Sequence, residues 1–147
     1  MRASLIALGI ADPPIKTFDD STATAEQAAA AIGTTVGSIV KSLVFMAGES
    51  PILVLVSGAN RADTAKLESL LGSKVKRATA DQVRSATGFA IGGVPPLGHA
   101  QPLPTYIDRH LLQHDEVWAA AGTPTSVFPI NPTTLVSITA GHVADIT

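Results

Sequence analysis

The order of apolar and polar residues predicts a chain of short strands and short helices. Apolar stretches bounded by turn-forming residues predict strands at 15–18, 44–46, 52–57, 74–78, 104–107, 116–120, 126–130 and 143–146. Apolar residues at helical spacing, between start and stop residues, predict helices at 2–9, 24–32, 63–72, 81–88, 108–112 and 131–140. Residues 39–45 fit either the end of a helix or a strand.

Several residues mark the ends of these elements. Thr24 and Gln27 are spaced as a capping box, in which a hydroxyl and an amide cap the first turn of a helix. Pro132 marks the first turn of the last helix, just after a capping asparagine. Residues 47–51 predict a hairpin turn, and the run 52–56 that follows is apolar on both faces. That run therefore predicts a strand at the centre of a sheet.

Strands and helices alternate at uneven spacing, which predicts a mixed α+β sheet rather than a doubly wound fold. The pattern leaves open whether this sheet closes on itself. A length of 147 residues predicts one domain, residues 1–147, and no internal repeat or linker divides the chain.

The composition removes several classes of function. The chain has no cysteine, which excludes disulfides, a thiolate nucleophile and a cysteine zinc site. No apolar run reaches the roughly 18–20 residues of a membrane span, and the N-terminus lacks a signal-peptide pattern. We therefore expect a cytoplasmic protein with no membrane contact.

Charge is distributed unevenly, although the formal net charge is only −2. The segment 61–84 contains six basic and three acidic residues, so it is basic within an acidic chain. Such a segment is either a phosphate-contact patch or an ordinary solvated face. The sequence does not separate these two alternatives.

Residues 88–99 contain four glycines and two prolines between regular segments. This composition predicts a stiff loop whose backbone can lie close to a ligand. The loop begins like a phosphate-binding loop at Gly93–Gly98, but His99 and Ala100 stand where Lys and Ser or Thr are needed. A nucleoside triphosphatase is therefore excluded.

Lys41 stands alone among apolar neighbours in 39–45. Its ammonium either reaches the surface or points into a polar pocket, where it would offer a fixed positive charge. His110 and His114 have the i, i+4 spacing of metal ligands, but no third ligand is evident. We therefore expect no metal and no cofactor. No serine motif or carboxylate pair marks a conventional nucleophile.

Four segments together resemble the YbaK/ProX family of aminoacyl-tRNA deacylases, which also occurs as the editing insertion of bacterial prolyl-tRNA synthetases. They are 39–45, 54–61, 86–99 and 118–124. The resemblance implies a mixed, strongly curved or barrel-like β-sheet surrounded by helices. It also implies hydrolysis of the ester that joins a wrong amino acid to the 3′ end of tRNA. Because no synthetase body is present, we expect editing in trans.

The resemblance assigns roles to particular residues. Lys41 matches the lysine that positions the substrate, and Gly92 and Gly93 match the loop whose backbone orients the ester. The expected substrate-binding residues are Phe45, Val94, Pro95, Pro96, Gly98, His99, Gly122 and Thr125. The basic segment 61–84, rather than the resemblance, provides the expected tRNA contacts Lys74, Lys76 and Arg77. The family has no protein nucleophile, so water or a substrate hydroxyl is expected to attack.

One position departs from the family pattern. Many close relatives carry a histidine just after the Gly-Thr-Pro segment, where this chain has Thr125. The identity of the amino acid that is removed therefore stays open, because one methylene changes pocket selectivity by only about 1–3 kcal/mol. The expected partners are misacylated tRNA and a prolyl-tRNA synthetase in a transient complex, with no DNA. The alternative function is a non-catalytic binding or regulatory module with the same fold.

Overall fold

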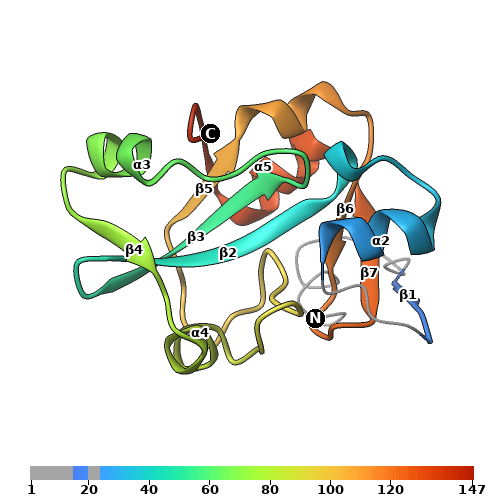
Figure 1. The fold of residues 1–147 in the computed structure, drawn as a ribbon, viewed down its shortest axis with the longest axis horizontal. Helices are drawn as coiled ribbons and strands as arrows, with labels where there is room; N and C mark the ends of the chain where they lie inside the picture. The colour runs from blue at the N-terminus through green and yellow to red at the C-terminus, as the bar shows by residue number, and fades with distance from the viewer. Residues whose placement is uncertain (1–14, 20–23) are drawn as a thin grey trace.

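Two β-sheets form the frame of the computed structural model, which describes residues 15–19 and 24–147 (Figure 1). The larger sheet has the order β4-β2-β3-β5-β8 and the smaller has the order β1-β7-β6. The strands of the larger sheet are β2 (Val40–Ala47), β3 (Ser50–Ser57), β4 (Val75–Arg77), β5 (Thr105–Asp108) and β8 (His142–Ala144). Those of the smaller sheet are β1 (Lys16–Thr17), β6 (Val117–Ala120) and β7 (Ser126–Ile130).

The larger sheet is mixed, which confirms the α+β prediction. β2 pairs antiparallel with both β3 and β4, whereas β5 pairs parallel with β3 and β8. The two sheets meet at one parallel bridge between Ile39 and Trp118. Within the described ranges, no further pairing closes the strands into a barrel.

β3 is the middle strand of the larger sheet, as its continuous apolar run predicts. Its residues from Leu53 to Val56 have no measurable exposure, because side chains cover both faces of the sheet. The hairpin of β2 and β3 is longer than the predicted one. Residues 40–43, which the sequence left undecided, extend β2, and the chain turns at Gly48 and Glu49.

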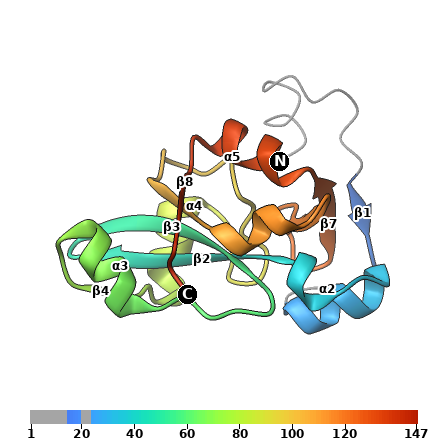
Figure 2. The ribbon, with the colours of Figure 1, turned by 90° about the horizontal axis from the view of Figure 1, so that it is seen from above.

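Helices pack around this frame (Figures 1 and 2). They are α2 (Ala25–Ile32), α3 (Thr64–Leu71), α4 (Ala80–Thr87) and α5 (Pro132–Thr139), with 3₁₀ turns η1 (Val36–Ser38) and η2 (Arg109–Gln113). Thr24 forms the predicted capping box with Gln27. A second capping box, formed by Thr79 with Gln82, starts α4 just before the predicted first turn. The predicted helix at 2–9 lies outside the described residues.

The alternation of side chains along β2 places neighbouring residues in different cores. Val40 and Val44 belong to one apolar cluster with Val94 of the glycine- and proline-rich loop. Leu43 and Phe45 belong to a second cluster on the other face. Neighbouring residues of β2, Lys41 among them, therefore point alternately to the two faces of the sheet. Among the described helices, none is long and apolar enough to cross a membrane.

Candidate active site

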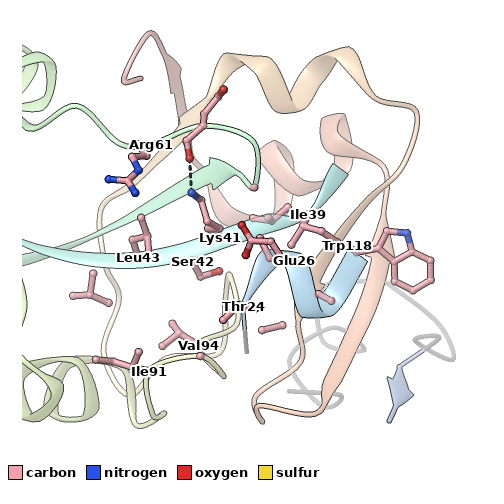
Figure 3. A pocket seen from close by; sticks show the side chains of 18 of the residues that line it. Thr24, Glu26, Ile39, Lys41, Ser42, Leu43, Arg61, Ile91, Val94 and Trp118 are labelled. Atoms are coloured by element: carbon pink, nitrogen blue, oxygen red, sulfur yellow. Dashed lines mark hydrogen bonds between the residues drawn. The ribbon is translucent and has the colours of Figure 1, made fainter. Parts of the chain in front are cut away.

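Part of the outer edge of β2 carries no paired strand. β4 pairs with β2 only from Phe45 to Ala47, and the last contact beyond it is the Ala78 N–H that donates to the Val44 carbonyl at 3.1 Å. The smaller sheet is bridged to Ile39, the residue just before β2. A pocket of about 510 Å³ opens along the edge between these two ends (Figure 3).

Lys41 extends from β2 into this pocket (Figure 3). Its Nζ donates a hydrogen bond to the backbone carbonyl of Asn60, which lies in the turn after β3. Asn60 also lines the pocket. The structure therefore settles the alternative that the sequence left open: the lysine is a half-buried cation in a pocket.

The surroundings of Lys41 weaken its hold on the proton. Burial is the main cause, and it lowers the pKa of Lys41 below the ordinary 10.5 because it disfavours the charged form. The nearby cations of Arg61 and Arg77 lower this pKa further. The carboxylates of Glu26 and Asp108 act in the opposite direction.

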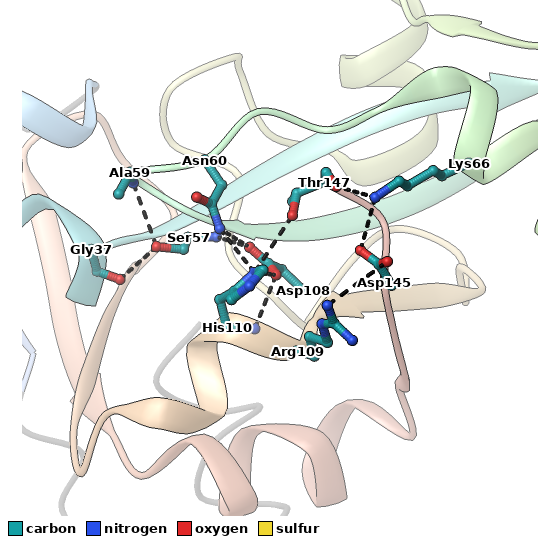
Figure 4. Close-up of polar contacts among 10 residues, drawn as sticks. All are labelled: Gly37, Ser57, Ala59, Asn60, Lys66, Asp108, Arg109, His110, Asp145 and Thr147. Carbon is teal, nitrogen blue, oxygen red and sulfur yellow. Dashed lines mark hydrogen bonds and ion pairs between the residues drawn. The ribbon is translucent and has the colours of Figure 1, made fainter.

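A buried carboxylate holds the turn that carries Asn60 (Figure 4). Asp108, fully buried at the end of β5, accepts hydrogen bonds from the Ser57 N–H at 3.1 Å and from Asn60 Nδ2 at 3.0 Å. It also accepts one from the His110 N–H at 3.0 Å. Burial alone would raise the pKa of Asp108, but these donors outweigh it and lower the pKa.

The loop at 88–99 provides another wall. Gly92, with φ at 89°, and Val94 line the pocket. Gly93 is buried, and a Cβ added there would lie 2.9 Å from the carbonyl carbon of Thr123. The missing side chain of Gly93 therefore lets this loop pack against the loop at 122–125. This close packing is a structural reason for a glycine at position 93.

The other predicted residues of the loop support its shape and do not line the pocket. Pro95 and Pro96 are buried, and Gly98 has φ at 79°. The Nε2 atom of His99 lies 2.7 Å from the Pro95 carbonyl, which ties the loop to itself. Burial is the main cause that lowers the pKa of His99.

The second predicted loop, at 122–125, is adjacent to the pocket, and residues on either side of it line the pocket. Gly122 has φ at 104°, and neither it nor Thr125 lines the pocket, whereas Ala120 and Val127 do. Phe45 is only 2% exposed and belongs to the core, where the Arg77 guanidinium lies 5.6 Å from its ring centre.

The candidate tRNA contacts lie on β4, the edge strand next to the pocket. Lys74, just before β4, and Lys76 are exposed. Arg77 also lines the pocket, so the structure connects the basic segment with the candidate site.

The two histidines of the metal-like spacing have different surroundings. His110 Nδ1 lies 2.9 Å from Asp108 Oδ1, in the network that supports Asn60, and His114 packs beside Gly37. Over 15–19 and 24–147, no group of three His, Cys, Asp or Glu residues could hold a metal ion. Metal independence stays a prediction for activity measurements.

Sequence reasoning missed several pocket residues. Asn60 and Arg61 lie in a segment that carries the family resemblance, but no pocket role was predicted for them, and Arg61 counted only as part of the basic segment 61–84. Glu26 carried only a helix-start signal, and nothing in the sequence places it near Lys41. Ser42 lies in an apolar stretch, and nothing in the sequence indicates that it lines the pocket.

Comparisons with known proteins identify the family of this chain. The family model of the aminoacyl-tRNA editing domain matches residues 19–138. The crystal structure of a proposed trans-editing enzyme for prolyl tRNA synthetase is 46% identical with a TM-score of 0.94, covering 99% of this chain and 93% of that one.

The chain is also similar to two named proteins. EbsC of Enterococcus faecalis, provisionally named a Cys-tRNA(Pro)/Cys-tRNA(Cys) deacylase, is 29% identical over 84% of this chain and 76% of its own length. A proline–tRNA ligase of Solidesulfovibrio magneticus is 35% identical over 66% of this chain, which is 17% of the ligase.

The fold and the extent of the family match define an editing domain with an α+β architecture. The chain belongs to the aminoacyl-tRNA editing domain family, and it is an aminoacyl-tRNA deacylase. This confirms the resemblance drawn from the four sequence segments. The family acts on misacylated tRNA and is related to a part of prolyl-tRNA synthetase.

Proposed function

We propose that this chain edits in trans, with Lys41 and the loop at 92–96 positioning the aminoacyl ester for hydrolysis. The observation that carries this proposal is the half-buried ammonium of Lys41, which donates to the Asn60 carbonyl in a pocket that Gly92 and Val94 also line. An ammonium held in a recess attracts the phosphate or the polar edge of the terminal adenosine. The ester then lies toward the loop backbone.

The reaction is hydrolysis of a carboxylic ester. The oxygen of water forms a bond to the carbonyl carbon, and the bond from that carbon to the ribose oxygen breaks. One proton of the water passes to the ribose oxygen, which leaves as a hydroxyl, and the other is released to solvent because the amino acid leaves as a carboxylate. Water or a substrate hydroxyl is the proposed nucleophile, as the family resemblance implies.

A substrate of misacylated tRNA also supports the partner and the location expected from the sequence. A prolyl-tRNA synthetase that releases misacylated tRNA is the proposed transient partner, because the relatives of this chain include proline–tRNA ligases. Aminoacyl-tRNA as substrate supports the cytoplasmic location expected from the sequence. Phe45, His99, Gly122 and Thr125 would then act by supporting the pocket walls.

Deacylation of a panel of misacylated tRNAs by the purified protein tests this proposal. Lys41→Ala should reduce kcat/KM by at least about 10²-fold, the usual effect of losing one electrostatic contact at a reacting centre. Lys41→Arg, which keeps the charge, should retain more activity. Lys66→Ala is the matched control, because that lysine contacts Asp145 and does not line the pocket. Wild-type rates in a folded Lys41→Ala protein would contradict the role of Lys41.

A further inference from the structure

The hydroxyl of Ser42 is buried in the pocket wall without a partner. Ser42 lines the pocket, and its Oγ has no hydrogen-bond partner among the residues that the structure describes. It follows Lys41 on β2, so the two side chains leave opposite faces of the strand (Figure 3). The pocket therefore touches a cation on one side of the β2 edge and a neutral hydroxyl on the other.

The surroundings of this hydroxyl are apolar. Val40 and Val44 flank Ser42 on the same face of β2, and both belong to the core cluster that contains Val83 of α4 and Val94 of the loop. All four valines line the pocket. Ser42 thus places one polar atom beside four valine side chains of the pocket wall.

The backbone of Ser42 faces the same space. The Val44 carbonyl accepts from Ala78 on the outer edge of β2, and backbone groups two residues apart on a strand point to the same side. The N–H and C=O of Ser42 therefore also point to this edge, beyond the end of the β4 pairing. A ligand at this edge meets three polar groups of one residue.

A buried polar group without a partner is unfavourable, and a ligand that supplies the missing hydrogen bond removes this cost. The group that fits here is neutral, because a charged ammonium in a valine-lined recess would need more than one hydroxyl to replace its water. Within an aminoacyl ester, a side-chain hydroxyl is such a neutral group.

Resting on the proposed editing function, we propose that Ser42 determines specificity by hydrogen bonding the side-chain hydroxyl of the amino acid in the ester. The substrate class that this implies is a tRNA charged with a small hydroxyl-bearing amino acid. Lys41 would hold the nucleotide end, and Ser42 would select the amino acid across the edge of β2.

The test compares seryl and 2-aminobutyryl esters of adenosine, which have the same number of side-chain heavy atoms and differ in hydroxyl against methyl. The wild-type protein should cleave the seryl ester with a kcat/KM about tenfold or more above that of the aminobutyryl ester. Ser42→Ala should remove most of this preference by slowing the seryl ester alone. Ser42→Thr, which keeps a hydroxyl, should retain the preference.

Two further measurements separate this role from a structural one. Ser42→Ala should leave the melting temperature unchanged or raise it, because the hydroxyl has no partner in the described residues of the unliganded protein. Ser69→Ala, on the exposed face of α3, is the matched control and should change neither rate.

The outcomes are distinct. Equal wild-type rates on the two esters, or an equal loss on both in Ser42→Ala, would overturn the inference while the editing function stands. The second result would place Ser42 against the ribose. Failure of the wild-type protein to cleave any aminoacyl ester would overturn the proposed function, and this inference with it.

Discussion

At the scale of single residues, the most informative group is the Lys41 ammonium, whose burial lowers its pKa. If the charged form binds substrate, kcat/KM should fall as pH rises through this lowered pKa, and the alkaline limb should lie below the ordinary 10.5. Lys41→Arg should move that limb to higher pH, because a guanidinium stays charged. The measurement is a pH profile on a minimal ester, corrected for spontaneous alkaline hydrolysis. A limb that is unchanged in Lys41→Arg would assign it to another group.

Asp108 provides the second prediction at this scale. Asp108→Ala should lower the free energy of unfolding by roughly 3 kcal/mol, because several N–H donors lose a buried acceptor. The pKa of Asp108 is lowered in the folded state. Its contribution is therefore complete above the unfolded pKa of about 3.9 and is lost as pH falls through the lower folded value.

Urea unfolding at neutral pH and in acid measures this effect, and the difference between wild type and Asp108→Ala should shrink in acid. Asp145→Ala is the matched control, because Asp145 is exposed and forms surface ion pairs that contribute about 0–1 kcal/mol. An equal loss in both variants would contradict the structural role of the buried carboxylate.

At the scale of elements, the contact between the two loops beside the pocket should control activity. Gly93→Ala places a Cβ 2.9 Å from the Thr123 backbone, so one loop must move. A displacement of this kind should reduce kcat/KM by about tenfold or more and lower the melting temperature. Gly48→Ala, at the hairpin turn with φ at 62° and open space around it, is the control and should cost only stability. Full activity in Gly93→Ala would exclude a role for this contact.

The sequence predicted elements better than it predicted contacts. Caps and apolar runs are local signals, so the helix starting at Thr24 and the central strand β3 could be predicted from them. The length of β2 could not, because apolar residues around Lys41 fit a helix or a strand until β3 pairs with them. The bond from Lys41 to Asn60 joins residues that are distant in sequence, and no periodicity encodes it.

At the scale of the whole molecule, the part of the basic segment at β4 should bind the acceptor stem of tRNA. Reversing Lys74 and Lys76 to glutamate should raise KM for misacylated tRNA and flatten the fall of affinity with salt, since each phosphate contact releases counterions. Arg77 stays unchanged in this variant because it lines the pocket. Hydrolysis of an aminoacyl-adenosine ester is the internal control and should not change. Equal loss on both substrates would indicate damage to the fold, and no loss would return these lysines to a solvated surface.

Trp118 gives the molecule a built-in optical reporter. It is the single tryptophan of the chain, it is 8% exposed, and it lines the pocket where the two sheets meet. Its indole also lies 5.0 Å from the Lys16 ammonium. Intrinsic fluorescence can therefore follow occupancy of the pocket by a non-hydrolysable aminoacyl-adenosine amide, with no turnover. A titration of this kind measures ligand binding separately from ester hydrolysis. Hydrolysis is the property that separates an enzyme from a binding module.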